Sequence, residues 1–336
     1  MILGSSVSEV AQLSLASLSG IRGRRMVLYR NGEEQQPLMG WGSVSAAESS
    51  GGSSCVPIPT EGSVKPVSSI DSSVIVLGEV DDGFVMAGKV TVSSRREGKK
   101  YAYVFGPSIF YIGESNVAKV NELLSNRLPE RFIIHDAAVA TRVVRVIMER
   151  AAALDVAINM SGGILALDGS LRVSNFEPSR CSLVRIAETC ERNGVVLMGV
   201  TKNTKLRPLQ RLEGKLYKST RPSFMEVSDV VRSIAPTVLG RSVLARLSSD
   251  GVPLRIDILT EEGLEGSLSS LVASDILCHG YPDTLKAAHI LSIFSLGEEE
   301  SAKGRLVRTE GTNVVQSFNV RRALLGKMQL GGRGGN

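Results

Sequence analysis

The stretch that decides the fold runs from residue 67 to residue 107, "VSSIDSSVIVLGEVDDGFVMAGKVTVSSRREGKKYAYVFGP". Three apolar segments in it, 67–80, 84–94 and 101–107, are separated by the polar turns "DDG" and "RREGKK". Segments rich in β-branched and aromatic residues, joined by such short polar links, favour antiparallel strands connected by hairpin turns. The stretch therefore predicts an antiparallel meander of three strands.

The next segments alternate between helical and extended patterns. Helices are expected over 114–128 and 136–157, the second with Asp136 as its N-cap. The apolar run "GGILALD" at 162–168 is typical of a central strand covered by helices on both faces.

A helix over 179–194 and a fifth strand over 195–201 complete the pattern. Three antiparallel strands, a helical region, and then strand, helix and strand form a specific order. This order matches the ribonuclease H-like (RNase H-like) arrangement, an α/β fold with a mixed five-stranded sheet flanked by helices. Because a fold does not by itself give a function, the site has to be argued from its residues.

We expect the RNase H-like domain to cover 67–300. An N-terminal arm with a Ser/Gly-rich linker is expected over 1–66, and its first part, 5–19, has a weak helical pattern. A C-terminal extension over 301–336 is expected to pack on the domain and to end in a flexible Gly-rich tail. Looser patterns predict a helix at 225–235, a strand at 252–259 and a helix at 283–296.

Composition excludes several classes of protein. The chain has 336 residues, 43% of them hydrophobic and 22% charged, as in ordinary globular proteins. It lacks an apolar run of about 18 residues, a basic leader and a GxxxxGK[ST] motif, which argues against a membrane span, a secretory signal and a P-loop ATPase. Four cysteines without a CxxC pair predict neither a zinc ribbon nor a disulfide framework, so we expect a reducing, cytoplasmic location.

The balance of charge is compatible with a nucleic-acid partner. The net charge is +5, the sequence pI is about 9.1, and basic residues cluster at 22–25, 95–100 and 202–211. Such clusters are also typical of solvated loops and helix faces, so charge alone does not identify the partner.

Two aspartates occupy unusual places in the predicted sheet. Asp71 lies inside the first strand, where Asp is disfavoured, although a solvent-facing strand surface shared by Ser69, Asp71 and Ser73 also explains it. Asp168 ends the fourth strand in "ILALDGSL", where the Asp-Gly pair is also typical of a turn. In the RNase H-like order these two strands are neighbours, so the carboxylates meet and raise one another's pKa. A divalent cation such as Mg²⁺ or Mn²⁺ removes that penalty.

A third carboxylate and a histidine complete the candidate site. Glu149 lies in the helix before the fourth strand, although Arg145 and Glu149 also form an ordinary i,i+4 surface pair. His289 lies in a helical stripe, where it can be a packed residue, complete a metal site or transfer a proton. His279 is ten residues away, so the two histidines do not form an HExxH-type pair.

These motifs resemble the NurA family of nucleases, known from archaea and some bacteria as partners of the HerA hexameric translocase in DNA end resection. The resemblance covers roughly residues 67 to 295, in the family's order. Its parts are "IDSS" around Asp71, the helical Glu149, "LALDGSL" around Asp168, "MGVTKNTKLRP" around Lys202 and "GYPDTLKAAH" ending at His289.

The resemblance implies an RNase H-like nuclease that forms a ring-like homodimer and works with a HerA-like hexameric ATPase in DNA repair by homologous recombination. It also implies a manganese-dependent activity, as a 5′ exonuclease on DNA and an endonuclease on single strands. Carried over by position, Asp71, Glu149 and Asp168 are metal ligands, His289 lies at or beside the metal, and Lys202 and Tyr281 lie near the substrate phosphates or support the site.

The sequence departs from the family pattern in three places. "IDSS" stands where the family more often has Asp-Gly-Ser, and "GYPDTL" stands where it has "GYPYPL". Glu149 is matched by position rather than by a sharp motif; Glu191 is a poorer match because it follows the fourth strand.

Three function classes remain to be compared. In a nuclease, water activated between two cations, or by one cation and His289, attacks a phosphodiester. An actin-like kinase or ATPase needs glycine-rich phosphate loops, and "IDSSVIV" supplies no glycine. A non-catalytic subunit that only binds DNA or a translocase has no reason to retain buried acids that are costly without a partner.

Overall fold

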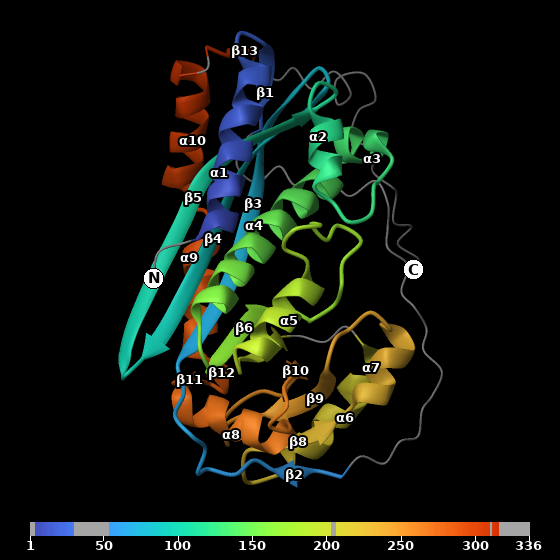
Figure 1. Ribbon diagram of the computed structural model, residues 1–336, viewed down its shortest axis with the longest axis vertical. Coiled ribbons are helices and arrows are strands. Elements are labelled where there is room, and N and C mark those ends of the chain that lie inside the picture. The colour runs from blue at the N-terminus through green and yellow to red at the C-terminus, as the bar shows by residue number, and fades with distance from the viewer. Residues whose placement is uncertain (1–3, 30–53, 203–205, 310, 316–336) are drawn as a thin grey trace, which may run out of the picture.

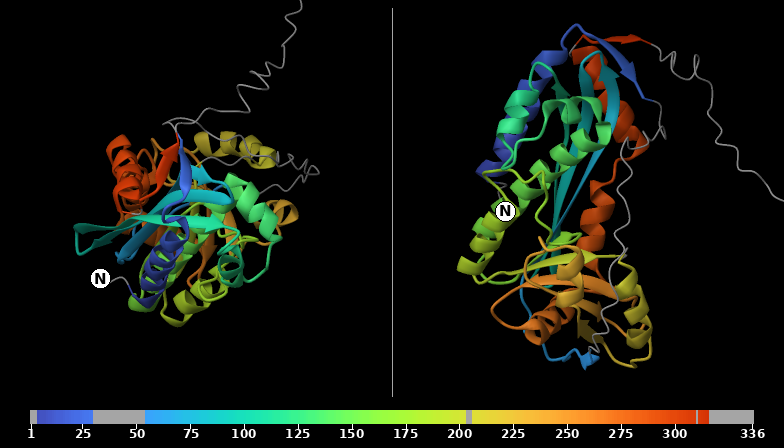
Figure 2. Two further views of the ribbon diagram at one scale, coloured as in Figure 1. Left: turned by 90° about the horizontal axis from the view of Figure 1, so that it is seen from above. Right: turned by 90° about the vertical axis from the view of Figure 1, so that its right-hand side faces the viewer.

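A long mixed β-sheet with helices on both faces forms the centre of the molecule (Figures 1 and 2). The computed structural model describes residues 4–29, 54–202, 206–309 and 311–315. The expectations for most of the Ser/Gly-rich linker and for the Gly-rich tail fall outside these residues.

The three-stranded meander predicted from the sequence is present. Strands β3 (Val67–Val80), β4 (Gly83–Arg96) and β5 (Lys99–Gly113) pair antiparallel in sequence order. The third strand is longer than expected, because the segment after Pro107 keeps pairing with β4 as far as Gly113. The tip of the β4–β5 hairpin projects at one side of the molecule (Figure 1).

The parallel part of the sheet follows the expected RNase H-like order. Strand β6 (Ile164–Asp168) pairs in parallel with β3, and β7 (Val196–Thr201) pairs in parallel with β6. The order β5-β4-β3-β6-β7, antiparallel and then parallel, is the predicted five-stranded core. Between β5 and β6 runs helix α4 (Ala137–Asn159), whose N-cap is Asp136, as predicted.

Helix α4 covers one face of this core together with α1 (Ser5–Leu18) and α5 (Leu183–Arg192). Figure 2 shows these helices on one side of the sheet and the C-terminal helices on the other. The packing is apolar, and burial of this surface is the main force that holds α4 to the strands. The contributing side chains include Ile70, Val92, Leu165, Leu167, Val143, Ile147, Ala151 and Leu154.

The sheet continues beyond the five strands in two places, past β7 and along the far part of β3, which the sequence did not predict. Beyond β7 it adds β10 (Leu254–Leu259), β9 (Arg241–Arg246), β8 (Ser223–Glu226) and β2 (Val56–Pro57). At the far end of β3 it adds β1 (Arg25–Leu28) and β13 (Asn313–Val315). Segments from the expected N-terminal arm and C-terminal extension therefore belong to the same sheet as the five-stranded core. Of the added strands, only the one at 252–259 had been expected.

Several helices differ from their predicted bounds. The helix expected over 114–128 is reduced to α2 (Val117–Glu122), because the Asn121 side chain bonds both the backbone N–H and the carbonyl of Leu128 and so turns the chain. A short helix, α3 (Glu130–His135), follows. The expected helix at 225–235 begins as strand β8, and only its second half forms α7 (Ser228–Ile234).

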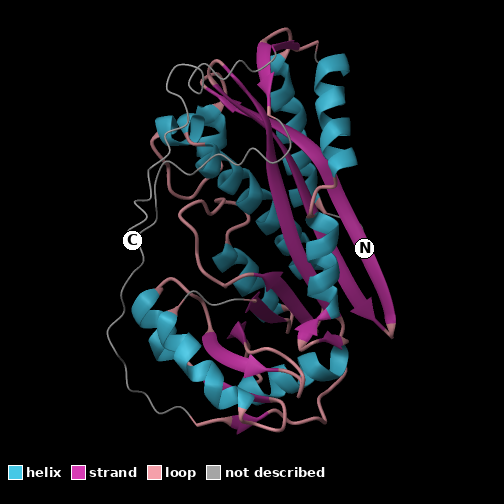
Figure 3. Cartoon of the chain, turned by 180° about the vertical axis from the view of Figure 1, so that it is seen from behind, coloured by secondary structure: helices cyan, strands magenta, loops and turns pink. Residues whose placement is uncertain are grey.

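The predicted helix at 283–296 is two helices. Helix α9 (Asp283–Ser292) ends where Ile293 becomes extended, and α10 (Leu296–Thr309) begins after it. Asp283 is the first residue of α9, and its carboxylate pairs with Arg95 and Lys100. Figure 3 shows α9 lying across the long strands on the face opposite α4.

The remaining described elements are the helices α6 (Arg207–Tyr217) and α8 (Leu264–Ser274), the 3-10 turn Ser19–Ile21, and the two-stranded hairpin of β11 (Leu277–Cys278) and β12 (Tyr281–Pro282). Among the described residues, none of the helices is both long enough and apolar enough to cross a membrane.

Candidate metal centre

The sheet divides where β3 and β6 stop pairing. Their last parallel pair is Ile70 with Leu167, and the next residues on the two strands are Asp71 and Asp168. Strand β1 joins the same edge of β3 only further on, at Gly78. The two aspartates therefore lie side by side at the opening of the sheet, as the predicted strand order required.

Helix α9 brings His289 to these two carboxylates. The His289 Nδ1 atom lies 2.7 Å from Asp71 Oδ2 and 3.3 Å from Asp168 Oδ2. One ligand atom from each of the three residues lies within 4.8 Å of the others. Asp71 is buried and the His289 side chain is 45% exposed, so the cluster lies at the edge of the core with one side accessible to solvent.

This donor set suits a divalent cation. Burial raises the pKa of Asp168, and the nearby Asp71 raises it too, while the ammonium of Lys202 opposes both effects. Two carboxylates held this close are costly without a positive partner. Carboxylate oxygens with one imidazole nitrogen are ligands that Mn²⁺ and Mg²⁺ accept, so the residues present fit such an ion.

Glu149 lies near this cluster but is not among its three members. Its carboxylate accepts a 3.1 Å hydrogen bond from the Ser72 hydroxyl, and its other oxygen pairs with Arg150 at 3.1 Å. Arg145 lies between the two acids, 3.6 Å from Asp71 and 4.0 Å from Glu149. Burial raises the pKa of Glu149, and the two arginines counteract this effect.

Lys202 and Tyr281 both contact Asp168. The Lys202 ammonium donates to Asp168 Oδ2 at 2.7 Å and lies 5.1 Å from the centre of the Tyr281 ring. The Tyr281 hydroxyl donates to Asp168 Oδ1 at 3.4 Å, and burial raises the pKa of this hydroxyl. His279, in the turn between β11 and β12, has a side chain that is 85% exposed and lies 3.7 Å from Asp250, outside the cluster.

A buried polar layer under α9 explains the polar first strand. Ser69 and Asp71 pair across the sheet with Ser93 and Thr91, and all four are buried rather than facing solvent. On α9, the Thr284 hydroxyl lies 2.6 Å from that of Ser69. The motif "SSIDSS" therefore places polar groups beneath a helix, and the interpretation of this face as solvent-exposed is wrong.

Residues that the sequence did not single out fix the start of α9. Asp275 is buried; it accepts hydrogen bonds from the backbone N–H and hydroxyl of Thr284, at 3.1 and 2.6 Å, and pairs with Arg95 at 3.1 Å. Arg95 also pairs with Asp283 at 3.0 Å. This network ties the helix that carries His289 to the β4–β5 hairpin. The basic cluster at 95–100 thus has structural partners, which its sequence did not reveal.

A second buried carboxylate fixes the loop after Asp168. Asp257 is fully buried and accepts the Leu171 backbone N–H at 3.1 Å and the Ser242 hydroxyl at 2.6 Å. Arg255 pairs with the same carboxylate at 2.8 Å. Gly169 adopts a φ of +123°, a value that side chains disfavour, so this glycine lets the chain leave the strand at once. The charged positions in "LRIDIL" were the signal that the sequence offered for this network.

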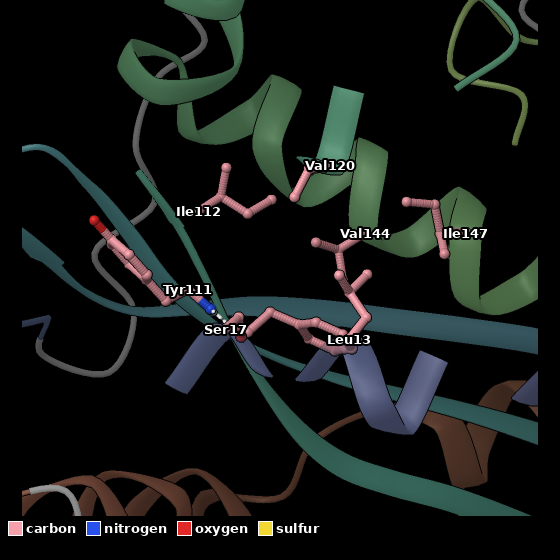
Figure 4. A pocket seen from close by; sticks show the side chains of 8 residues that line it. Leu13, Ser17, Tyr111, Ile112, Val120, Val144 and Ile147 are labelled. Atoms are coloured by element: carbon pink, nitrogen blue, oxygen red, sulfur yellow. Dashed lines mark hydrogen bonds between the residues drawn. The ribbon is translucent and has the colours of Figure 1, made fainter. Parts of the chain in front are cut away.

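The cavity in Figure 4 is distinct from this centre. It lies between α1, β5 and α4, has a volume of about 10 Å³, and is lined mainly by apolar side chains such as Leu13, Ile112 and Val144. The Tyr111 backbone N–H donates to Ser17 beside it. A space of this size holds about one water molecule, so it is a packing defect and not a substrate site.

Comparisons with known proteins give matches among solved structures only. No protein-family model matches the chain, and neither does any curated protein. The NurA nuclease from Sulfolobus solfataricus is 14% identical with a TM-score of 0.44, and the match covers 75% of this chain and 86% of that one. A second NurA structure is 11% identical with a TM-score of 0.48, covering 77% and 91%.

An endonuclease V from Streptomyces avermitilis also matches, at 15% identity and a TM-score of 0.35, over 70% of this chain and 83% of that one. Structures of NurA nucleases are thus among those to which this chain is similar, as its motifs led us to expect.

Proposed function

We propose that this protein is a metal-dependent nuclease that hydrolyses phosphodiester bonds in DNA. The observation that carries the proposal is the meeting of Asp71, Asp168 and His289, from three different elements, at the opening of the sheet. Such a cluster has no structural need for its charge, because apolar side chains would fill the same place at lower cost. A bound hard cation would offset the repulsion between the two carboxylates and so explain why charged residues occupy this place.

The residues of the cluster and its neighbours have different roles in the proposed reaction. Asp71, Asp168 and His289 hold Mn²⁺ or Mg²⁺, which when bound polarises the phosphate and makes water a stronger nucleophile. The imidazole, which is 45% exposed, can also hold or transfer a proton at its second ring nitrogen. Lys202 is the cation nearest to Asp168 and is partly exposed, so it can meet a phosphate oxygen, while Tyr281 steadies Asp168.

The finer assignments rest on the motif resemblance. We propose 5′ exonuclease and single-strand endonuclease activity, manganese as the preferred ion, a homodimer, and action with a HerA-like hexameric ATPase in the resection of DNA ends during double-strand break repair. The net charge of +5 supports a polyanionic substrate. The four cysteines are all free thiols, which supports a reducing cytoplasm.

The test is cleavage of end-labelled single- and double-stranded DNA by the purified full chain, with Mn²⁺, with Mg²⁺ or with EDTA. We expect metal-dependent shortening that falls at least 100-fold, on the order of the loss seen when charge stabilisation is removed, in Asp71→Asn and Asp168→Asn. Asp229→Asn removes a fully exposed carboxylate on α7 and serves as the matched control, with unchanged cleavage expected.

Three results would contradict the proposal in different ways. Cleavage at the original rate by Asp168→Asn would show that Asp168 does not belong to the active site. Tight DNA binding without cleavage under any metal would instead favour a non-catalytic subunit, and ATP hydrolysis without cleavage would favour the kinase-like class.

A further inference from the structure

The two oxygens of Asp71 face different partners. Oδ2 lies 2.7 Å from His289 and belongs to the three-residue cluster. Oδ1 accepts the Ser72 backbone N–H at 2.8 Å and lies 3.6 Å from the guanidinium of Arg145. Asp71 thus has a cation-binding side and an arginine side.

The arginine side is where a second cation would have to sit. A second cation would need oxygen ligands outside the three-residue cluster, from a carboxylate near Asp71. Glu149 is the acid in that position, and Arg145 lies between the two, with its nitrogens 3.6 Å from Asp71 and 4.0 Å from Glu149.

Both carboxylate oxygens of Glu149 already interact with other side chains. One oxygen accepts from the Ser72 hydroxyl, and the other pairs with Arg150 at 3.1 Å. Arg150 is buried and held in turn by Glu177, at 3.4 Å, so it cannot swing away. A cation between Asp71 and Glu149 would have to displace Arg145 and compete with this buried pair.

Arg145 differs from Arg150 in its access to solvent. Its side chain is 49% exposed, against 6% for Arg150, although both lie on α4 beside the same glutamate. A planar guanidinium with exposed N–H groups is well suited to bind two phosphate oxygens at once. Arg145 can therefore touch substrate while Glu149 and Asp71 hold it in place.

We propose that the centre uses a single cation, held by Asp71, Asp168 and His289, and that Arg145 supplies the second positive charge. Arg145 is then a catalytic residue that contacts the scissile phosphate and stabilises the charge that builds up on it. Glu149 positions Arg145 and does not bind metal. The inference rests on the proposed nuclease function and replaces the two-cation arrangement with one ion and one arginine.

The experiment measures bound metal and cleavage separately. Titration of the full chain with Mn²⁺, followed by calorimetry and by the electron paramagnetic resonance signal of free Mn²⁺, counts ions per chain without requiring any activity. We expect a single ion per chain in the original protein and in Arg145→Ala, because Arg145 is outside the three-ligand cluster.

Cleavage is then compared among variants at saturating Mn²⁺. Arg145→Ala should cleave about 100-fold more slowly, and Arg145→Lys, which keeps the charge but loses the fork of donors, should be intermediate. Arg142→Ala is the matched control, because Arg142 is one turn earlier on α4 and stacks 5.9 Å from the Phe176 ring. It should retain most of the activity.

The outcomes separate this inference from the proposed function. Two Mn²⁺ ions bound per chain of the original protein, or cleavage by Arg145→Ala at the original rate, would overturn the role of Arg145 and leave the nuclease intact. Failure of the original protein to bind Mn²⁺ or to cleave DNA would instead overturn the proposed nuclease function, on which this inference rests.

Discussion

Asp257 shows how strongly a single buried charge depends on its partners. It is fully buried, and its carboxylate is satisfied by Arg255, the Ser242 hydroxyl and the Leu171 backbone. Such a pair is stable only while both members are present, because an uncompensated buried charge is far costlier than no charge at all. The loop that leaves Asp168 is therefore fixed by a residue outside the cluster of Asp71, Asp168 and His289.

Replacing Asp257 by Ala should lower the free energy of unfolding by about 3 to 5 kcal/mol, since Arg255 would be left buried without its carboxylate. The measurement is urea denaturation followed by circular dichroism. The double variant Arg255→Met, Asp257→Leu should recover most of this loss, because it removes both charges and fills the space with apolar groups. A loss below about 1 kcal/mol in Asp257→Ala, the range of an exposed ion pair, would contradict this account.

Local pattern made some of the site predictable and left the rest hidden. Asp71 and Asp168 could be placed together because strand order alone makes their strands neighbours, and His289 could be added from the motif. Asp275 could not be predicted, because its partner Arg95 lies on a distant strand. Asp257 was signalled only by the charges in "LRIDIL", and its hydrogen bond to Leu171 depends on the fold. Arg145 was visible only as a surface partner of Glu149, since its distance to Asp71 depends on how α4 packs across the sheet.

At the scale of elements, the position of α9 is fixed at both ends by charge. Its start is tied to Arg95, and its end is tied by Lys89, a buried lysine in β4 next to an irregularity in strand pairing. The Lys89 ammonium donates to the Ile293 carbonyl at 2.9 Å and to Glu298 on α10 at 2.8 Å. The sequence predicted one continuous helix here, because the periodic pattern does not show that Lys89 holds the break at Ile293.

This lysine gives a prediction for stability in acid. Its hydrogen bond lowers the pKa of Glu298 from 4.5 to about 2, so the ionised form is favoured by the folded state. The resulting stabilisation is complete above pH about 4.5 and is lost as the pH falls towards 2. Glu298→Gln should therefore be less stable than the original protein at pH 7, and the difference should shrink between these two values. Urea denaturation at several pH values measures it; a difference that stays constant would contradict the pairing.

At the scale of the whole molecule, the cluster joins segments that are far apart in the chain. Asp71 lies on β3, Asp168 on β6 and His289 on α9, and the last of these packs on the face opposite α4. A bound ion would therefore act as a cross-link between the meander, the parallel strands and the C-terminal helices. Because the unfolded chain does not keep these ligands together, binding energy becomes folding energy.

Mn²⁺ should accordingly stabilise the protein against heat and denaturant. At a concentration 100 times its dissociation constant, the expected gain is about 2.7 kcal/mol over the protein in EDTA. His289→Ala should lose most of this gain, because the ion would then be held by two carboxylates alone, while Asp229→Asn, whose carboxylate is fully exposed, should keep it. Differential scanning calorimetry with and without Mn²⁺ measures the shift. An equal gain in the original protein and in His289→Ala would mean that the stabilising ion binds elsewhere, and that the three residues do not form the metal centre.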